Sequence, residues 1–154
     1  MSEENKAIAI RTIEALDRNS GPVMDLYARD AQTFMQGDPP FDMATYKRFS
    51  GEFFGAFPDL VHNVDEVTAE GDRVVLQITV TGTHKGTFEG IAATGTSIRY
   101  PSMVTYRIRD GKIASTRAVF DTLALLRQLG AARLPQSALG VGGLVWVFRG
   151  QGTL

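Results

Sequence analysis

Cysteine is absent from this chain of 154 residues, and histidine occurs only twice, as His62 and His84. Without a thiol, the chain has no disulfide, no thiolate nucleophile and no sulfur ligand for zinc. A first-row metal site built on two histidines would need carboxylates to complete its coordination shell. We therefore expect no metal.

Several motifs of nucleotide, calcium and hydrolase sites are also missing. No G-x-G-x-x-G follows an expected strand, and G-x-x-x-x-G-K-[ST], H-E-x-x-H, an EF-hand loop and the G-x-S-x-G elbow do not occur. The chemistry that remains is acid–base catalysis, and we expect it to proceed without a cofactor.

Neither sign of charge dominates the chain. Sixteen Lys and Arg stand against 17 Asp and Glu, with a net charge of −1 and no basic block, so we expect no nucleic-acid partner. No apolar run reaches about 18 residues, and the first ten residues lack the basic start of a signal peptide. We expect no membrane association and a cytoplasmic location.

Apolar residues make up 44% of the sequence, which suits one domain with a sizeable core over residues 1–154. No linker or internal repeat divides it. The glycine-rich tail, residues 132–154, contains the apolar stretch LVWVF. Such a segment is expected to pack as a strand or plug on its own chain or as a dimer contact, and a lid over a pocket is the other interpretation.

Helical periodicity dominates the first part of the chain. Ile10, Ile13 and Leu16 recur at helical spacing before a break at residues 19–22. A short second helical piece is expected around Met24–Tyr27. Asp42 is placed to cap a third helix, whose apolar stripe over residues 43–57 is rich in aromatic side chains.

From residue 60 onward the period changes to two. Residues 74–81 alternate between apolar and more polar side chains, residues 98–108 form another strand, and Asp110-Gly111 turns the chain into a third at 112–120. Helices followed by a meander predict an α+β fold, in which a curved antiparallel sheet wraps around the N-terminal helices.

Asp121 stands between the last alternating segment and a leucine-spaced segment that ends at Gly130. Its position is typical of a helix N-cap, and Gly130 of the residue after a helix end. If the strand persists, however, Asp121 shares a face with Ile113, Ser115 and Arg117. On a pocket-facing strand the carboxylate would meet a substrate, so the residues alone leave a cap and a catalyst both open.

Five segments in the same order resemble the SnoaL-like polyketide cyclase family. They are FPD at 57–59, EGDRVV at 70–75, GTHKGTFEGIAATG at 82–95, YRIRDGKI at 106–113 and FDTLALLRQLG at 120–130. The similarity covers roughly residues 5–131. It implies an NTF2-like conical barrel with a deep apolar pocket, no metal, and a homodimer or higher oligomer.

The resemblance also implies a reaction of secondary metabolism, the intramolecular aldol closure of a polyketide, with its acid–base residue at Asp121. A carboxyl group ordinarily titrates near pH ~3.9, so it needs apolar burial to become a useful base. Aromatic and apolar side chains would line such a pocket, although some of them would belong to the plain core. The candidates are Tyr27, Phe34, Phe53, Phe57, Tyr100 and Met103.

The two histidines are interpreted differently. His84, in T-H-K-G, fits a half-exposed turn residue. The resemblance instead implies a place near the pocket, where it would assist Asp121 through a hydrogen bond to a substrate carbonyl or to the carboxylate. His62 has polar neighbours in the sequence, so we expect it to be solvated and assign it no role.

Ser115 and Arg117 depart from the pattern that the chain resembles, because many relatives read IVEHW where this chain reads IASTR. Both are candidate substrate contacts. An inward Arg117 would need a partner, and pairing with a carboxyl group would weaken that group as a base. It could instead stabilise an enolate, bind a substrate carboxylate, or lie in water at a twisted strand end.

Other functions stay open because a fold does not fix a function. Limonene-type epoxide hydrolases share the cone but use an aspartate–arginine–aspartate set, and this chain has no D-x-R pair on one strand. Isomerisation, hydroxylation, polyene cyclisation and a non-catalytic module that binds small molecules are further alternatives. The expected ligand is apolar, oxygenated and similar to a polyketide.

Overall fold

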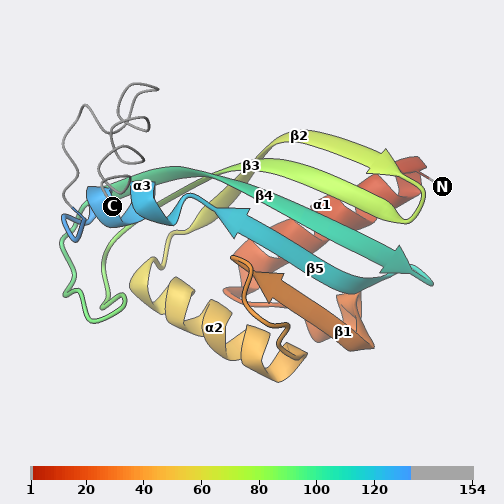
Figure 1. Cartoon of the computed structure of the whole chain (residues 1–154), viewed down its shortest axis with the longest axis horizontal. Helices are drawn as coiled ribbons and strands as arrows, with labels where there is room; N and C mark the ends of the chain where they lie inside the picture. Colours follow the sequence, from red (N-terminus) through yellow and green to blue (C-terminus); the bar gives the residue numbers. More distant parts are fainter. Residues whose placement is uncertain (1, 133–154) are drawn as a thin grey trace, which may run out of the picture.

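The computed structural model describes residues 2–132 of the chain. The packing expected for the apolar stretch of the tail therefore falls outside the described residues. Figure 1 shows the elements in chain order. They are α1 (Ser2–Asn19), the 3-10 turn η1 (Met24–Leu26), β1 (Tyr27–Met35), α2 (Met43–Ala56), β2 (Val61–Glu70), β3 (Arg73–Thr83), β4 (Ser97–Arg109), β5 (Lys112–Phe120) and α3 (Thr122–Gln128).

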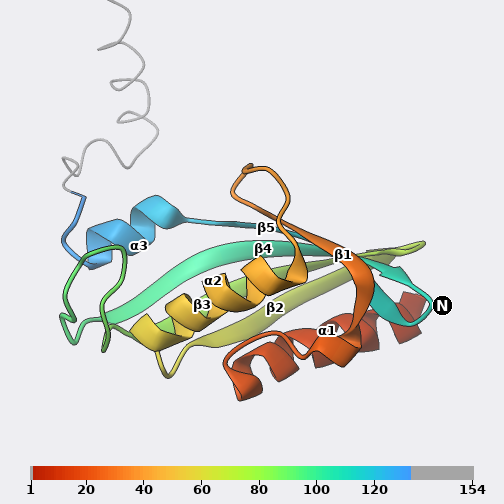
Figure 2. The ribbon, with the colours of Figure 1, turned by 90° about the horizontal axis from the view of Figure 1, so that it is seen from below.

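The strands form one curved sheet in the order β1-β5-β4-β3-β2, with α1 and α2 on the same face (Figures 1 and 2). The α+β architecture predicted from the sequence is confirmed. One detail was wrong: β1 pairs with β5 in parallel, so the sheet is mixed and not purely antiparallel. We call the face toward α1 and α2 the inner face and the opposite one the outer face.

The helix ends lie where the sequence predicts them. α1 stops at Asn19, whose side-chain amide donates to the carbonyl of Ala15 at 2.7 Å. α2 begins after Asp42, whose carboxylate accepts the amide of Thr45 at 2.9 Å and fills the N-cap role. No helix within residues 2–132 has the length and apolar composition needed to cross a membrane.

Tyr27 was expected in a helical piece, but it begins strand β1. The helical part is limited to the single turn η1, Met24–Leu26. β1 is hard to recognise because its pairing with β5 is irregular between Tyr27 and Gln32, so buried and exposed residues do not alternate regularly. A disrupted ladder removes the period of two on which strand prediction depends.

The predicted alternation in β3 and β4 is confirmed. The two strands pair along their lengths and direct apolar side chains to the inner face. The buried members are Val74, Leu76, Ile78, Val80, Ile98, Tyr100, Val104, Tyr106 and Ile108. Asp110 and Gly111 have φ values of 53° and 72°, which is the left-handed pair typical of a tight hairpin turn.

A β-bulge in β5 determines which side chains reach the inner face. Ile113 lies opposite Ile108 and Ser115 lies opposite Arg107, so Ala114 is an extra residue in β5. Before the bulge Ile113 points to the inner face. After the bulge the inward-facing residues are Thr116, Ala118 and Phe120. The sequence prediction that Arg117 and Asp121 share the face of Ile113 is therefore wrong.

The loop after β3 is fastened to the end of α2. The amides of Lys85 and Gly86 both donate to the carbonyl of Ala56, at 2.9 and 3.0 Å. A Cβ at Gly86 would lie 2.3 Å from the backbone oxygen of Gly55. The close approach of loop and helix thus requires glycine at this position.

We expect Gly86→Ala to destabilise the fold by about 1–3 kcal/mol, because the backbone of α2 must move to admit the methyl group. Gly51→Ala in the same helix, where a Cβ meets nothing within 4 Å, should stabilise it by about 0.5–1 kcal/mol. Urea unfolding of both variants measures the difference. Equal effects of the two changes would contradict the proposed junction.

Candidate functional site

A central cavity of about 70 Å³ lies between the inner face of the sheet and the helices α1 and α2. Most of its wall is apolar. The described residues with polar side chains in the wall are Tyr46, Ser50, His62, Tyr100, Ser102, Tyr106 and Thr116. The cavity is therefore an apolar space with a limited set of hydrogen-bonding groups, which is typical of small-molecule sites.

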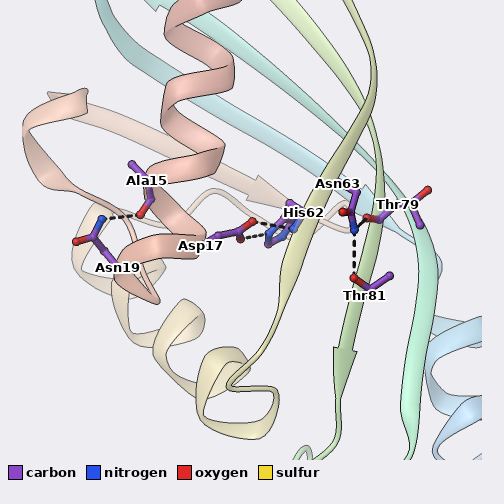
Figure 3. A network of polar contacts seen from close by, with 7 residues as sticks. All are labelled: Ala15, Asp17, Asn19, His62, Asn63, Thr79 and Thr81. Carbon is purple, nitrogen blue, oxygen red and sulfur yellow. Dashed lines mark hydrogen bonds and ion pairs between the residues drawn. The ribbon is translucent and has the colours of Figure 1, made fainter.

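His62 is held in the cavity wall by Asp17, a residue of the last turn of α1 (Figure 3). One carboxylate oxygen of Asp17 lies 2.5 Å from Nδ1 of His62, and the other accepts the backbone amide of His62 at 2.8 Å. Both side chains are largely buried, with exposed fractions of 15% for His62 and 18% for Asp17. The imidazole is thus fixed in position at the cavity.

The fold explains how this pair arises. His62 lies on β2, an edge strand of the sheet, whose outward backbone amides have no neighbouring strand to receive them. The carboxylate of Asp17 accepts hydrogen bonds from the backbone amide of His62 and from its imidazole ring. Asn63, the next residue, points to the other face and donates to Thr79 and Thr81 (Figure 3). The expectation that His62 is solvated is therefore wrong.

The contact with Asp17 also determines how His62 can react. Asp17 accepts a hydrogen bond at Nδ1, so Nδ1 carries the proton of the neutral ring. Nε2 then has a free lone pair, and no hydrogen-bond partner for it is found among the described residues. A fixed imidazole with a free Nε2 in an apolar cavity is suited to take up a proton.

The hydroxyls of Tyr27, Tyr46 and Tyr106 are buried close to one another. Burial raises the pKa of Tyr46 to about 12, and the carboxylate of Asp17 adds to the shift. Burial also raises the pKa of Tyr27 and Tyr106 well above 10, and neighbouring tyrosine hydroxyls add to both shifts. At neutral pH all these phenols keep their protons, so they are available as hydrogen-bond donors.

Aromatic side chains form one end of the cavity. The ring of Phe53 lies 5.8 Å from that of Phe120 and 5.0 Å from that of Phe88, and both contacts are edge to face. Tyr100 packs against Phe120 at 5.8 Å. His62 lies level with Tyr100, because both pair with Val80, whereas Tyr106 is six residues further along β4, about 20 Å of strand away.

The structure brings only two of the predicted lining residues, Phe53 and Tyr100, to the central cavity. Tyr27 and Phe57 are buried in the core behind its wall. Of the other candidates, Met103 is 44% exposed and lines a shallow groove on the outer face. Phe34 and Ser115, which are half-buried, do not line the central cavity either.

Arg117 and Asp121 lie outside the central cavity, as the bulge in β5 requires. Arg117 is exposed, as in the alternative that placed it in water, and its guanidinium lies 4.5 Å from the ring centre of Phe34, its parallel neighbour on β1, in a cation–π contact. Asp121 is exposed, lines the outer groove, and accepts the amide of Ala124 at 2.8 Å as the N-cap of α3. The predicted cap is confirmed.

His84 is buried, with an exposed fraction of 0%, and this contradicts the half-exposed turn. It does not line the central cavity either. Its ring packs 5.3 Å from that of Phe57, and Nδ1 lies 2.9 Å from the hydroxyl of Thr94. These contacts anchor the loop between β3 and β4 to the core, so His84 occupies a structural position.

The sequence-based prediction missed Asp17 and His62, although two signals were present. An acidic residue in the last turn of a helix is unfavourable because the helix dipole is negative at that end. Asp17 therefore needs a partner, and such a local conflict often marks a functional site. The second signal is that His62 shares strand parity with Val64, which packs on the core.

Comparison with known proteins identifies the family of the chain. The chain matches the model of the SnoaL-like polyketide cyclase family over residues 7–129 and therefore belongs to that family. No curated protein sequence matches it.

Among solved structures, the chain is similar to AclR from Streptomyces galilaeus, provisionally described as a hydroxylase. The identity is 30%, the match covers 86% of this chain and 100% of AclR, and the TM-score is 0.79. IdmH from Streptomyces antibioticus, provisionally described as a polyketide cyclase, is 26% identical over 79% of this chain and 97% of its own, with a TM-score of 0.68. A SnoaL-like protein from Jannaschia sp. CCS1 is 22% identical over 86% of this chain and 95% of its own and shares the fold, with a TM-score of 0.76.

The buried tyrosines predict how stability depends on pH. The unfolded chain releases phenolic protons near pH 10, while burial holds the pKa of Tyr27, Tyr46, Tyr100 and Tyr106 above 10 in the folded protein. Stability is therefore fully present below pH 10 and is lost as the pH rises, by up to ~1.4 kcal/mol per pH unit for each tyrosine. Urea unfolding between pH 8 and pH 11 should show this fall, and Tyr46→Phe should make it shallower. Identical slopes in the two proteins would contradict the assignment.

Proposed function

We propose that this protein is a cofactor-free enzyme that closes a ring in an apolar, polyketide-derived substrate by an intramolecular aldol reaction. Its family membership supports the substrate class. One observation carries the acid–base part of the proposal: a histidine oriented by an aspartate lines an apolar cavity, and its Nε2 has no hydrogen-bond partner among the described residues.

In the proposed mechanism, Nε2 of His62 takes a proton from a carbon that lies between two carbonyl groups. The resulting enolate carbon attacks a ketone carbon of the same molecule, and a carbon–carbon bond forms. The new alkoxide then takes the proton back from Nε2. Asp17 is a positioning residue, because it holds the ring and balances the charge of the imidazolium while the enolate exists.

The size of the cavity adds a condition. Its volume of about 70 Å³ is below the ~300–1,000 Å³ of most ligand pockets. A substrate as large as a polyketide therefore fits only if side chains that line the cavity change rotamer. Phe49, Phe88 and Phe120 at the aromatic end are only partly buried, so we propose that the substrate enters there.

The wall of the cavity favours this chemistry over water activation by an aspartate–arginine–aspartate set. Among the described residues that line it there is no arginine and no aspartate. His84 and Asp121 remain candidates through the family resemblance alone. A test must therefore separate His62 from Asp121.

The test uses pentane-2,4-dione, a small 1,3-diketone, and follows deuterium exchange at its central carbon by NMR. His62→Asn keeps an amide donor for Asp17 but lacks Nε2, so we expect the catalysed exchange to fall by about 10²- to 10⁴-fold. Asp121→Asn keeps the helix cap and removes only the charge, so it should retain exchange. Loss of exchange in Asp121→Asn with full activity in His62→Asn would instead support the residue implied by the resemblance. Absence of exchange in the wild type would support a non-catalytic binding module.

We also propose that two copies of the chain associate through the outer face of the sheet. Met103 and Val119 are cross-strand neighbours there and are 44% and 52% exposed. A homodimer would cover this apolar pair. Light scattering should show a dimer that Met103→Asp converts to a monomer, whereas Met24→Asp, at an equally exposed methionine of η1, should leave it intact. A wild-type monomer would contradict the proposal.

A further inference from the structure

The hydroxyl of Tyr100 is a polar group at the central cavity without a hydrogen-bond partner among the described residues. Tyr100 is 3% exposed and lines the cavity from β4, with its ring held 5.8 Å from that of Phe120. Burial alone raises the pKa of this phenol above its usual value, and no hydrogen bond contributes to the shift. A buried hydroxyl is normally paired, so an unpaired one at a cavity indicates that a ligand supplies the partner.

The hydroxyl of Tyr100 is also open to a ligand. The hydroxyls of Tyr106 and Thr116, which belong to the same wall, are completely enclosed by protein atoms, whereas that of Tyr100 is not. Nε2 of His62 is likewise not enclosed. A molecule in the cavity can therefore contact both Tyr100 and His62 without any change in the fold.

The strand register places these two groups on either side of one residue. His62 and Tyr100 both pair with Val80, and all three side chains line the cavity from the inner face. Two strand spacings put the backbones of His62 and Tyr100 about 10 Å apart. An enolisable carbon, its carbonyl oxygen and a contact of about 3 Å at either end span about 8 Å. The spacing therefore suits a ketone held between the two side chains, above Val80.

The other polar side chains of the wall are engaged or more distant. Ser102, two residues further along β4, donates its hydroxyl proton to the carbonyl of Val119 at 3.1 Å. Tyr106 and its register partner on β5 lie about 20 Å of strand from Tyr100. A side-chain hydrogen bond joins the two polar residues of α2, Tyr46 and Ser50. On the sheet, Tyr100 is thus the donor that remains beside His62.

Resting on the proposed function, we propose that Tyr100 is a second catalytic residue, which donates a hydrogen bond to the carbonyl oxygen of the ketone that His62 deprotonates. When Nε2 takes the proton, the electron pair of the C–H bond forms the enolate, and negative charge develops on that oxygen. The phenol keeps its own proton, so its hydrogen bond strengthens as the charge grows and weakens when the enolate carbon attacks the second ketone. Tyr100 thus stabilises the enolate, whereas Asp17 stabilises the imidazolium.

The test is Tyr100→Phe, which removes the hydroxyl and keeps the ring that packs on Phe120. At saturating pentane-2,4-dione we expect deuterium exchange to fall by about 10- to 100-fold, because the enolate loses a donor. Binding of the diketone should weaken by only about 2- to 10-fold, because the neutral ketone makes a weaker hydrogen bond than the enolate. NMR measures both quantities. Urea unfolding should show that the variant is at least as stable as the wild type, since an unpaired hydroxyl is removed.

Tyr27→Phe is the matched control. Tyr27 is also 3% exposed, but it lies behind the wall of the cavity, so the same chemical change there should leave exchange and binding unaltered. The inference is overturned if the wild type does not bind the diketone. It is also overturned if Tyr100→Phe exchanges saturating diketone as fast as Tyr27→Phe does.

The experiment separates this inference from the proposed function. Exchange that requires His62 but not the hydroxyl of Tyr100 would overturn the inference and leave the proposed base in place. Binding that weakens in Tyr100→Phe but not in Tyr27→Phe, without catalysed exchange in the wild type, would support Tyr100 as the donor to the ketone oxygen and contradict the catalytic role of His62.

Discussion

The contact between Asp17 and His62 is the interaction on which both the fold and the site depend. It joins the last turn of α1 to the edge strand β2, and the carboxylate satisfies a backbone amide as well as the imidazole. An edge strand without such a partner exposes its amides to water or to other chains. The same contact fixes the tautomer of His62, so one carboxylate both satisfies the edge strand and orients the residue that we propose as the base.

The site combines several features that are unfavourable when considered alone. Asp17 places negative charge at the negative end of a helix, and the hydroxyls of Thr33 and Thr116 are buried without a hydrogen-bond partner among the described residues. The surrounding core offsets these costs, since Phe57, Leu76 and Ile113 are almost fully buried. Such concentrated conflicts, in a fold that otherwise follows local rules, are characteristic of sites shaped for binding or catalysis.

Local signals allowed much of the fold to be predicted. The cap at Asp42, the alternation in β3 and the turn at Asp110-Gly111 each depend on a few neighbouring residues, and the structure has all of them. The resemblance to the SnoaL-like polyketide cyclases is likewise confirmed as family membership.

Three of the misplaced site residues, Ser115, Arg117 and Asp121, share one physical cause. A bulge of a single residue at Ala114 reverses the parity of β5, and no local pattern marks an extra residue in a strand. Arg117 and Asp121 were therefore placed on the wrong face. His62 was missed for another reason: its partner Asp17 is 45 residues away in the chain, and only the packing of α1 on β2 brings the two together.

The central claim is that Asp17 holds His62 with a free Nε2 at the substrate cavity. The most direct measurement is the 15N NMR spectrum of the His62 ring, recorded with and without pentane-2,4-dione. We predict a proton on Nδ1, a bare Nε2 in the free protein, and a shift of the Nε2 signal when the diketone binds. A proton on Nε2 in the free protein, or an Nε2 signal that does not respond to bound diketone, would contradict it.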